Sequence, residues 1–320
     1  MLRILTYHRI AEASRDPHLN PRLISATPEV FAAQMRHLAE QYQVVRLTEV
    51  LEAAVAGKPL PKRAVLITFD DAYRDFLEVA WPILQSHGLP SVLFVPTAYP
   101  DHPERAFWWD RLYRAFADPA CTRLESPELG TLSLLTRLER LSALRSASNR
   151  CKELEHDKAM DLVDELCDQL GHESQPYRSV LDWNELRCLS REDVTLCAHT
   201  TWHPLLTRVP HERVWFEVMH SQRDVRREVG EVLPVFSYPD GAHDDDVVET
   251  LRQQGFLVAV TQLDGHNDLR RTDPLRLQRT NITPRTTLPF FKLRLQNWFT
   301  HIDRWRHGQG RRFPARGTAS

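Results

Sequence analysis

Two short segments of the chain carry residue types that could hold a catalytic metal ion. Asp70 and Asp71 end an apolar run that begins at residue 65, and His199 and His203 lie four residues apart just before a proline. Two imidazoles and one carboxylate form the ligand set of many catalytic zinc ions, because three protein ligands leave a coordination position open for water. The second aspartate would then remain as a base. The residue types therefore predict a metal-dependent hydrolase.

The spacing of these residues is compatible with one shared site. Histidines four apart can turn both rings toward one point, in a helical turn or in a tight turn. The apolar run before Asp70 predicts a buried parallel strand, and α/β folds place their chemistry at the carboxyl ends of such strands. Each half also has a plainer explanation, since Asp71 could cap a helix and a lone pair of histidines is commonly incidental. Their occurrence together favours the metal site.

The same segments resemble the motifs of a known family, the polysaccharide deacetylases of the NodB-homology type, also called carbohydrate esterase family 4. Residues 68–71 (TFDD) resemble the first motif, and residues 199–204 (HTTWHP) resemble the second. Residues 236–241 (FSYPDG) resemble the third, in the F-x-Y-P-x-G form of one branch. The resemblance extends over roughly residues 1–285, less a middle insert. It implies an α/β fold, a distorted (β/α)7 barrel.

The resemblance also implies a reaction and a set of roles. The reaction is removal of N-acetyl groups from an amino-sugar-containing oligo- or polysaccharide, or from a lipid-linked intermediate. Asp71, His199 and His203 would hold a divalent metal; Zn²⁺ is the default, although cobalt, nickel or iron would suit the same ligands. Asp70 would be the base, and the backbone N–H of Asp240 would stabilise the oxyanion. The alternatives are a non-catalytic metal-containing glycan-binding or assembly module and a sugar O-deacetylase or deformylase.

The chain departs from the common family pattern in two places. Ser237 stands where the third motif usually has an arginine that orients the base, and the late Leu-His motif that supplies the general acid is not visible. Some family members look circularly shifted and begin with a Y-H-x-I strand. His8 lies in such a strand and is the expected acid, with His243 and His266 as rivals.

The remaining candidate residues are assigned to contact with the substrate. They are Tyr238, Pro239, Gly241, Trp108, Trp109 and Arg279. The two tryptophans could stack on sugar rings, or they could simply anchor the insert to the barrel. Arg279 could instead orient Asp70 in place of the missing arginine, or it could pair elsewhere on the barrel.

Strands and helices that could position these residues alternate along the chain. Strands are expected near residues 2–7, 43–46, 64–69, 91–95, 194–197, 235–238 and 256–260. A helix should begin after Thr27 as its N-cap and run to about Gln41, and other helices should end at Gly57, Gly88, Gly230 and Gly255. Such alternation builds a parallel sheet, open or closed into a barrel. The acidic run 244–246 is interpreted as a helix cap.

Two regions interrupt this alternation. Residues 1–288 are expected to form the barrel, with a mostly helical insert at about residues 100–190 that includes helical stretches at 132–144 and 158–170. Residues 289–320 are an amphipathic aromatic and basic tail whose end is expected to be disordered. Its first part, to residue 305, could cover the barrel as a helix or lie on an anionic membrane.

Composition limits the partners. The 320 residues include 41 basic and 43 acidic ones, so no global field attracts nucleic acid, and a neutral glycan is an acceptable ligand. Five cysteines without C-x-x-C spacing suggest reduced thiols. With no apolar signal segment at the start, we expect a cytoplasmic protein that can be membrane-peripheral. The sequence does not predict its oligomeric state.

Overall fold

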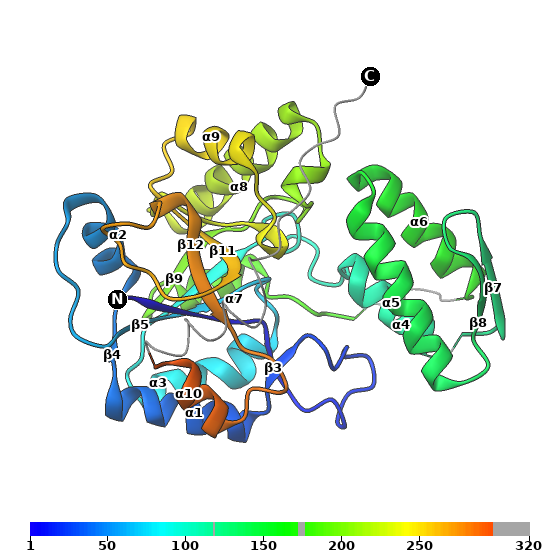
Figure 1. Ribbon diagram of the computed structural model, residues 1–320, viewed down its shortest axis with the longest axis horizontal. Coiled ribbons are helices and arrows are strands. Elements are labelled where there is room, and N and C mark those ends of the chain that lie inside the picture. The colour runs from blue at the N-terminus through cyan, green and yellow to red at the C-terminus, as the bar shows by residue number, and fades with distance from the viewer. Residues whose placement is uncertain (118, 172–176, 297–320) are drawn as a thin grey trace. The chain divides into compact units, whose positions relative to one another are not determined.

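The structure is a computed structural model that describes residues 1–117, 119–171 and 177–296. The chain forms two compact units, which are coloured by residue number in Figure 1. The first, here called the barrel unit, contains residues 1–12, 22–102 and the described chain from 180 onward. The second, the insert unit, contains residues 13–21 and 103–179.

Seven parallel strands close a barrel, which confirms the predicted fold. In order around the barrel they are β1 (Arg3–Tyr7), β12 (Leu277–Asn281), β11 (Val258–Asp264), β10 (Val235–Ser237), β9 (Val194–Ala198), β6 (Ser91–Val95) and β5 (Ala64–Phe69). The ring closes because β5 also pairs with β1, with Tyr7 opposite Phe69. The short β4 (Gln43–Val44) pairs with the first residues of β5. Since all strands of the ring run in parallel, their carboxyl ends share one rim.

Alternate residues of the strands belong to two apolar clusters. Leu5 and Ile67 join the cluster that includes Phe31 of the outer helix α1 (Pro28–Gln41), whereas Ile4 and Leu66 join another with Phe94 and Val260. Successive side chains of a strand point to opposite faces. Continuing this alternation past Leu66 puts Thr68 and then Asp70 on the same face, so the strand pattern itself aims Asp70 into the barrel.

Helices surround the barrel strands. They are α1, α2 (Leu47–Ala56), a π-helical turn η1 (Phe76–Ala80) continuing into α3 (Trp81–Ser86), α7 (Trp183–Leu189), α8 (His211–Val229), α9 (Asp245–Gln253) and α10 (Leu288–Arg294). Figure 1 shows α8 and α9 together on one side of the strands and α1 with α3 and α10 on another. Thr27 caps α1 by accepting from the Val30 N–H at 3.3 Å, as predicted. Asp244 caps α9 in the same way, so the acidic run has the predicted helix-capping role.

The insert unit consists mainly of helices. It contains α4 (Trp108–Ala117), α5 (Arg137–Glu153), α6 (His156–Gln169) and a hairpin of β7 (Arg123–Ser126) and β8 (Gly130–Ser133). Leu112, Leu144 and Val163 from the three helices pack in one apolar core. The helix expected at 158–170 is α6. The helix expected from residue 132 was wrong at its start: Leu132 belongs to β8, and the capping box of Thr136 begins the helix one turn later.

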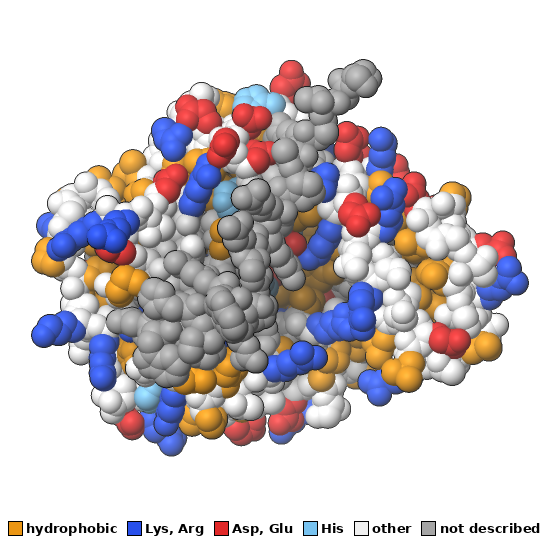
Figure 2. Space-filling view, in the orientation of Figure 1, with side chains coloured by type: hydrophobic (Ala, Val, Ile, Leu, Met, Phe, Trp, Pro, Cys, Tyr) orange, Lys and Arg blue, Asp and Glu red, His pale blue; other side chains and the backbone are white. Residues whose placement is uncertain are grey.

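The described part of the C-terminal tail contains α10. Phe291 and Leu295 are buried in the core of the barrel unit, while Phe290 is exposed. The helix ends at Arg294 instead of continuing directly toward residue 305 as expected; residues 297–305 lie outside the described residues, as does the expected disorder of the end. None of the described helices combines the length and the apolarity needed to cross a bilayer. Figure 2 shows acidic and basic side chains interspersed on the face drawn, in keeping with a formal net charge of −2.

Candidate active site

Asp71, His199 and His203 come together as a buried cluster. Their ligand atoms lie within 4.8 Å of one another. The Asp71 Oδ1 atom is 3.6 Å from Nε2 of His199 and 3.3 Å from Nε2 of His203. Asp71 is the second residue after β5, and His199 directly follows β9, so the common rim of the barrel brings together residues from distant parts of the chain.

A tight turn rather than a helix presents the two histidines. Thr200 has a φ of 64° and His203 a φ of 58°, both in the left-handed region, and Asp71 has a φ of 74°. Such conformations cost about 1 kcal/mol or more each for residues other than glycine, and they concentrate at functional sites. The His203 N–H donates to Thr200 Oγ1 at 2.9 Å, which stabilises the turn from within.

A buried carboxylate of α8 supports this turn from outside. One oxygen of Glu217 accepts the backbone N–H groups of Thr201 and Trp202, each at 2.9 Å. Burial raises the pKa of Glu217, although these N–H donors and the nearby Arg213 oppose that rise. The sequence interpretation missed Glu217. The available signal was an acidic residue on the apolar face of a helix, between Val214 and Val218.

The protonation of the cluster suits a metal. His199 Nδ1 donates to the Ser237 carbonyl at 2.7 Å, which leaves the Nε2 lone pair for the cluster. Burial lowers the pKa of His199 to about 4, so the ring is neutral at pH 7. Burial opposes ionisation of Asp71, but the close contact with His203 holds its pKa well below the usual range.

The residues present therefore fit a divalent cation. Asp71 Oδ1 is buried and accepts no hydrogen bond from the part of the chain that the structure describes. One such carboxylate oxygen with two imidazole nitrogens is the donor set of three-ligand zinc sites, and the same donors also suit other first-row metals.

Asp70 has a different partner from its neighbour. Arg279 of β12 binds both of its oxygens, with Nη1 to Oδ1 at 2.8 Å and Nη2 to Oδ2 at 2.7 Å. Gln262 adds a hydrogen bond to Oδ2 at 3.2 Å. Burial raises the pKa of Asp70, but the guanidinium charge and hydrogen bonds, with a smaller effect of His199, hold it below its ordinary value. Asp70 is therefore an ionised, oriented carboxylate.

Arg279 is fully buried, and its hydrogen bonds decide between the alternatives for its role. Besides the two bonds to Asp70, Nε donates to the Thr261 carbonyl at 2.7 Å, Nη1 to Thr68 Oγ1 at 3.2 Å and Nη2 to Ser237 Oγ at 3.1 Å. These bonds use all five N–H groups of a guanidinium. Arg279 thus orients Asp70, as one of the alternatives held, and it has no N–H group left for a substrate.

Ser237 connects the two halves of the site. Its hydroxyl accepts from Arg279, while its carbonyl accepts from His199. The position that carries arginine in the common third motif is therefore filled here by a small residue, which leaves room for an arginine from β12. The motif pattern marked Ser237 only as a departure, and the sequence interpretation did not include it in the site.

The turn after β10 carries the other residues of the third motif. Tyr238 is buried, and its hydroxyl donates to the Leu275 carbonyl at 2.9 Å, so this ring supports the turn from beneath. Pro239 is also buried. Asp240 has a φ of 52°, and Gly241 packs so closely on Gln262 that a Cβ would lie 2.4 Å from the Gln262 nitrogen. This contact couples the turn to a residue that binds Asp70.

His8 lies at the rim beside the aspartates. It follows β1, and the Asp70 N–H donates to the Tyr7 carbonyl at 3.0 Å, so His8 and Asp70 continue neighbouring strands. Among lesser effects, the charge of His8 contributes to the lowered pKa values of Asp70 and Asp71. The His8 N–H donates to Ser25 Oγ at 2.9 Å, which fixes its backbone.

The two rival histidines have other surroundings. His243 donates from Nδ1 to the Gly241 carbonyl at 2.8 Å and stacks on Tyr238 at 5.0 Å. His266 is buried and donates from Nε2 to the Arg294 carbonyl at 3.1 Å. Burial, together with the charge of Arg3, lowers the pKa of His266. Arg3 begins β1, at the end of that strand opposite His8. The geometry therefore favours His8 over His266 as a neighbour of Asp70.

The two tryptophans assigned to sugar stacking lie in the insert unit. Trp109 stacks on the buried Phe107 at 4.6 Å between ring centres, and Trp108 meets Trp109 edge to face at 5.4 Å. Trp108 also packs against the apolar core of that unit. Both side chains are partly exposed. Their packing gives them an anchoring role within the insert unit, and a contact with sugar stays a prediction.

Comparison with known sequences identifies a family and several relatives. A family model described as "Polysaccharide deacetylase" matches residues 57–259. Over 100 residues the chain is 33% identical to the poly-beta-1,6-N-acetyl-D-glucosamine N-deacetylase of Escherichia coli (strain K12). That aligned segment covers 31% of this chain and only 14% of the length of the Escherichia coli protein.

Comparison with solved structures supports the fold. The Streptococcus pyogenes deacetylase PplD in complex with acetate aligns with a TM-score of 0.63 at 18% identity, over 92% of this chain and 98% of that chain. IcaB from Ammonifex degensii aligns with a TM-score of 0.60 at 17% identity, over 92% of this chain and 97% of that chain. At these identities the likeness concerns the architecture of the chain.

Proposed function

The chain belongs to the polysaccharide deacetylase family, and from this membership we propose that it hydrolyses N-acetyl groups on the amino sugars of an oligo- or polysaccharide. One observation carries the proposal. Asp70 and Asp71 are adjacent in the chain, yet Asp71 faces two histidines while Asp70 is held by Arg279. A hydrolase that uses a metal and a separate base needs this division of partners. A purely glycan-binding module would not need the second, oriented carboxylate.

Asp71, His199 and His203 would hold the metal, with Zn²⁺ as the first choice from their donor types. When bound, such an ion lowers the pKa of a coordinated water toward about 7 and polarises a carbonyl oxygen. The neutral His199 ring, fixed by its bond to the Ser237 carbonyl, is ready to act as a ligand without first losing a proton.

Asp70 would take the proton from the attacking water on one of its carboxylate oxygens. Arg279 keeps both oxygens in place and keeps the carboxylate ionised before the reaction. The backbone N–H of Asp240, in the turn after β10, would stabilise the negative oxygen that forms on the acetyl carbon. His8 would deliver a proton to the departing nitrogen. The products are acetate and a free amine on the sugar.

The substrate class follows from the family and from its named relative. The Escherichia coli protein is named for a polymer of N-acetylglucosamine, so an N-acetylglucosamine chain is the first substrate to try. The aligned segment is only 100 residues long, so the length and linkage of the preferred sugar chain must be determined by experiment.

The test is acetate release from N-acetylglucosamine oligomers by zinc-loaded protein, with bound zinc measured in each sample. We expect the wild type to release acetate, Asp70→Asn to keep zinc but lose turnover by at least about 100-fold, and His199→Ala to lose both. Zinc binding without acetate release from any N-acetylated oligomer would contradict the proposed reaction. Full turnover by Asp70→Asn would contradict the proposed base.

A further inference from the structure

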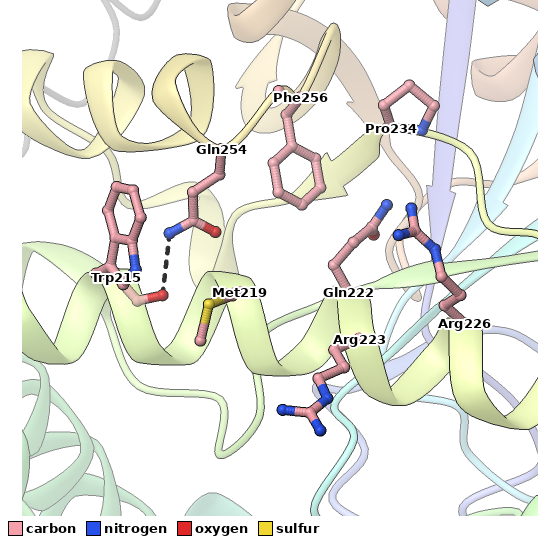
Figure 3. A pocket seen from close by; sticks show the side chains of 9 residues that line it. Trp215, Met219, Gln222, Arg223, Arg226, Pro234, Gln254 and Phe256 are labelled. Atoms are coloured by element: carbon pink, nitrogen blue, oxygen red, sulfur yellow. Dashed lines mark hydrogen bonds between the residues drawn. The ribbon is translucent and has the colours of Figure 1, made fainter.

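The outer face of α8 forms one wall of a groove in the barrel unit. The groove has a volume of about 460 Å³, and its other wall is the segment that follows α9 (Figure 3). Its main lining residues are Trp215, Met219, Arg223 and Arg226 of α8 with Gln254 and Phe256. The α8 residues recur at intervals of three or four, so they form one stripe along the helix. Trp215 and Met219 are each 39% exposed, so both offer apolar surface to a ligand in the groove.

The charges on this helix are not balanced within the groove. Outside the groove, Arg213 lies 3.6 Å from Glu217, and Arg227 pairs with Asp224 at 2.8 Å. Arg223 and Arg226 are exposed, and within the described residues neither makes an ion pair or a side-chain hydrogen bond. Like charges three residues apart on a helix destabilise it slightly. A ligand with a negative group would remove that repulsion.

The rest of the lining suits a sugar ring. A tryptophan offers a flat apolar face of the kind that packs on the C–H face of a pyranose. Figure 3 shows Trp215 and Gln254 facing each other, with Arg223 projecting from α8. The Gln254 amide nitrogen donates to the Trp215 carbonyl at 3.0 Å, which fixes this amide in the wall. Aromatic, amide and guanidinium groups together can hold the ring, hydroxyl and acidic group of one sugar.

We propose that this groove is a second, non-catalytic glycan site that binds an anionic oligosaccharide, one whose pyranose rings carry carboxylate or phosphate groups. The choice of a glycan over another anion rests on the proposed function. The groove shares α8 with the metal site, because Glu217 on the buried face of this helix holds the turn between His199 and His203. A polymer bound along the exposed face would thereby be held on the element that supports the catalytic rim.

The test measures binding to metal-free protein, so that it does not depend on hydrolysis. The probes are a hyaluronan tetrasaccharide, which alternates N-acetylglucosamine with glucuronate, and the neutral N-acetylchitotetraose. We expect the acidic probe to bind at least tenfold more tightly and to weaken as salt is raised. Arg223→Ala with Arg226→Ala should reduce its affinity at least tenfold, and Trp215→Ala at least fivefold. Arg191→Ala, an exposed arginine in the turn before β9, is the matched control and should bind like the wild type.

Three results would overturn the proposal. One is equal affinity for the acidic and the neutral tetrasaccharide. Another is unchanged binding in the double arginine variant. The third is tighter binding of a tetraglutamate peptide than of the acidic sugar, which would make the groove a site for an acidic protein segment. The experiment measures binding and not turnover. A protein without deacetylase activity could therefore still bind the acidic sugar in this groove, and the two proposals can fail independently.

Discussion

Asp70 and Asp71 show how strongly a residue's role depends on its neighbours. The two side chains are chemically identical and adjacent, but one lies against a guanidinium and the other against two imidazoles. The motif predicted the division of roles, whereas the partner of Asp70 could not be read from it. Arg279 is 209 residues away in sequence, and only closure of the barrel brings it to Asp70.

The Asp70–Arg279 pair should be strongly coupled. We expect Arg279→Met to lower the free energy of unfolding by about 3–5 kcal/mol, because it leaves a buried carboxylate without its partner. Arg279→Met combined with Asp70→Asn should be less destabilised than the sum of the two single variants. Denaturant unfolding of the four proteins measures this coupling. Additive losses would show that the ion pair is not a unit.

Asp75 gives a prediction about pH. Burial raises its pKa to about 6, although the charge of Arg9 and the Ile10 N–H oppose that rise. Between about pH 4 and 6 the folded protein therefore holds a proton that the unfolded chain has released, and stability from this group is lost as the pH rises through that window.

Comparison with Asp75→Asn isolates this group, because asparagine does not titrate. The free energy of unfolding of the wild type, relative to the variant, should fall by roughly 3 kcal/mol at most between pH 4 and 7. Urea unfolding at several pH values measures the difference. If the difference in free energy of unfolding between the two proteins stayed constant from pH 4 to 7, the raised pKa of Asp75 would be ruled out.

The sequence predicts some elements of the barrel better than others. Most strands are continuous apolar runs, and their positions were predicted to within a few residues. β12 was not predicted because its centre is polar: the sequence of Gln278, Arg279 and Thr280 is more typical of a loop than of a buried strand. Arg279 is accommodated there only because acceptors from three other strands surround it. A tight turn at the two histidines was one of the predicted alternatives, but the left-handed conformation of Thr200 could not be predicted, because β-branched residues rarely adopt a positive φ.

The turn after β10 should tolerate no side chain at Gly241. An alanine there would be strained at a φ of 70° and would press its Cβ against the Gln262 backbone. We expect Gly241→Ala to lower kcat by at least about tenfold, because Gln262 also binds Asp70. Gly88→Ala is the matched control, with a φ of 62° and open space around it.

The control distinguishes the backbone strain of alanine at a positive φ from the steric contact with Gln262. Gly88→Ala should cost about 1 kcal/mol of stability and leave kcat unchanged. Acetate release and thermal unfolding of both variants make the comparison. If both substitutions changed kcat equally, the close approach to Gln262 would not be the cause.

At the scale of the whole molecule, metal binding and folding stability should be linked. The three ligands come from segments after β5 and β9, which meet only in the folded barrel. Zinc at 1,000 times its Kd should stabilise the protein by about 4 kcal/mol, which for a chain of this size raises Tm by roughly 5–10 °C. His199→Ala should show no such rise. An equal rise in wild type and variant would place the zinc elsewhere.

Closure of the barrel by β1 and β12 also bears on how the protein is made. The ribosome releases β5, with its two aspartates, long before Arg279 is synthesised. At roughly 5–20 residues per second, the interval is about 10–40 seconds for the 209 residues between Asp70 and Arg279. During that time Asp70, at the end of β5, lacks the guanidinium of Arg279 as its partner. A barrel interior that excludes water therefore cannot form around this carboxylate. The growing chain should therefore remain open at this rim, and accessible to chaperones, until β12 has been synthesised.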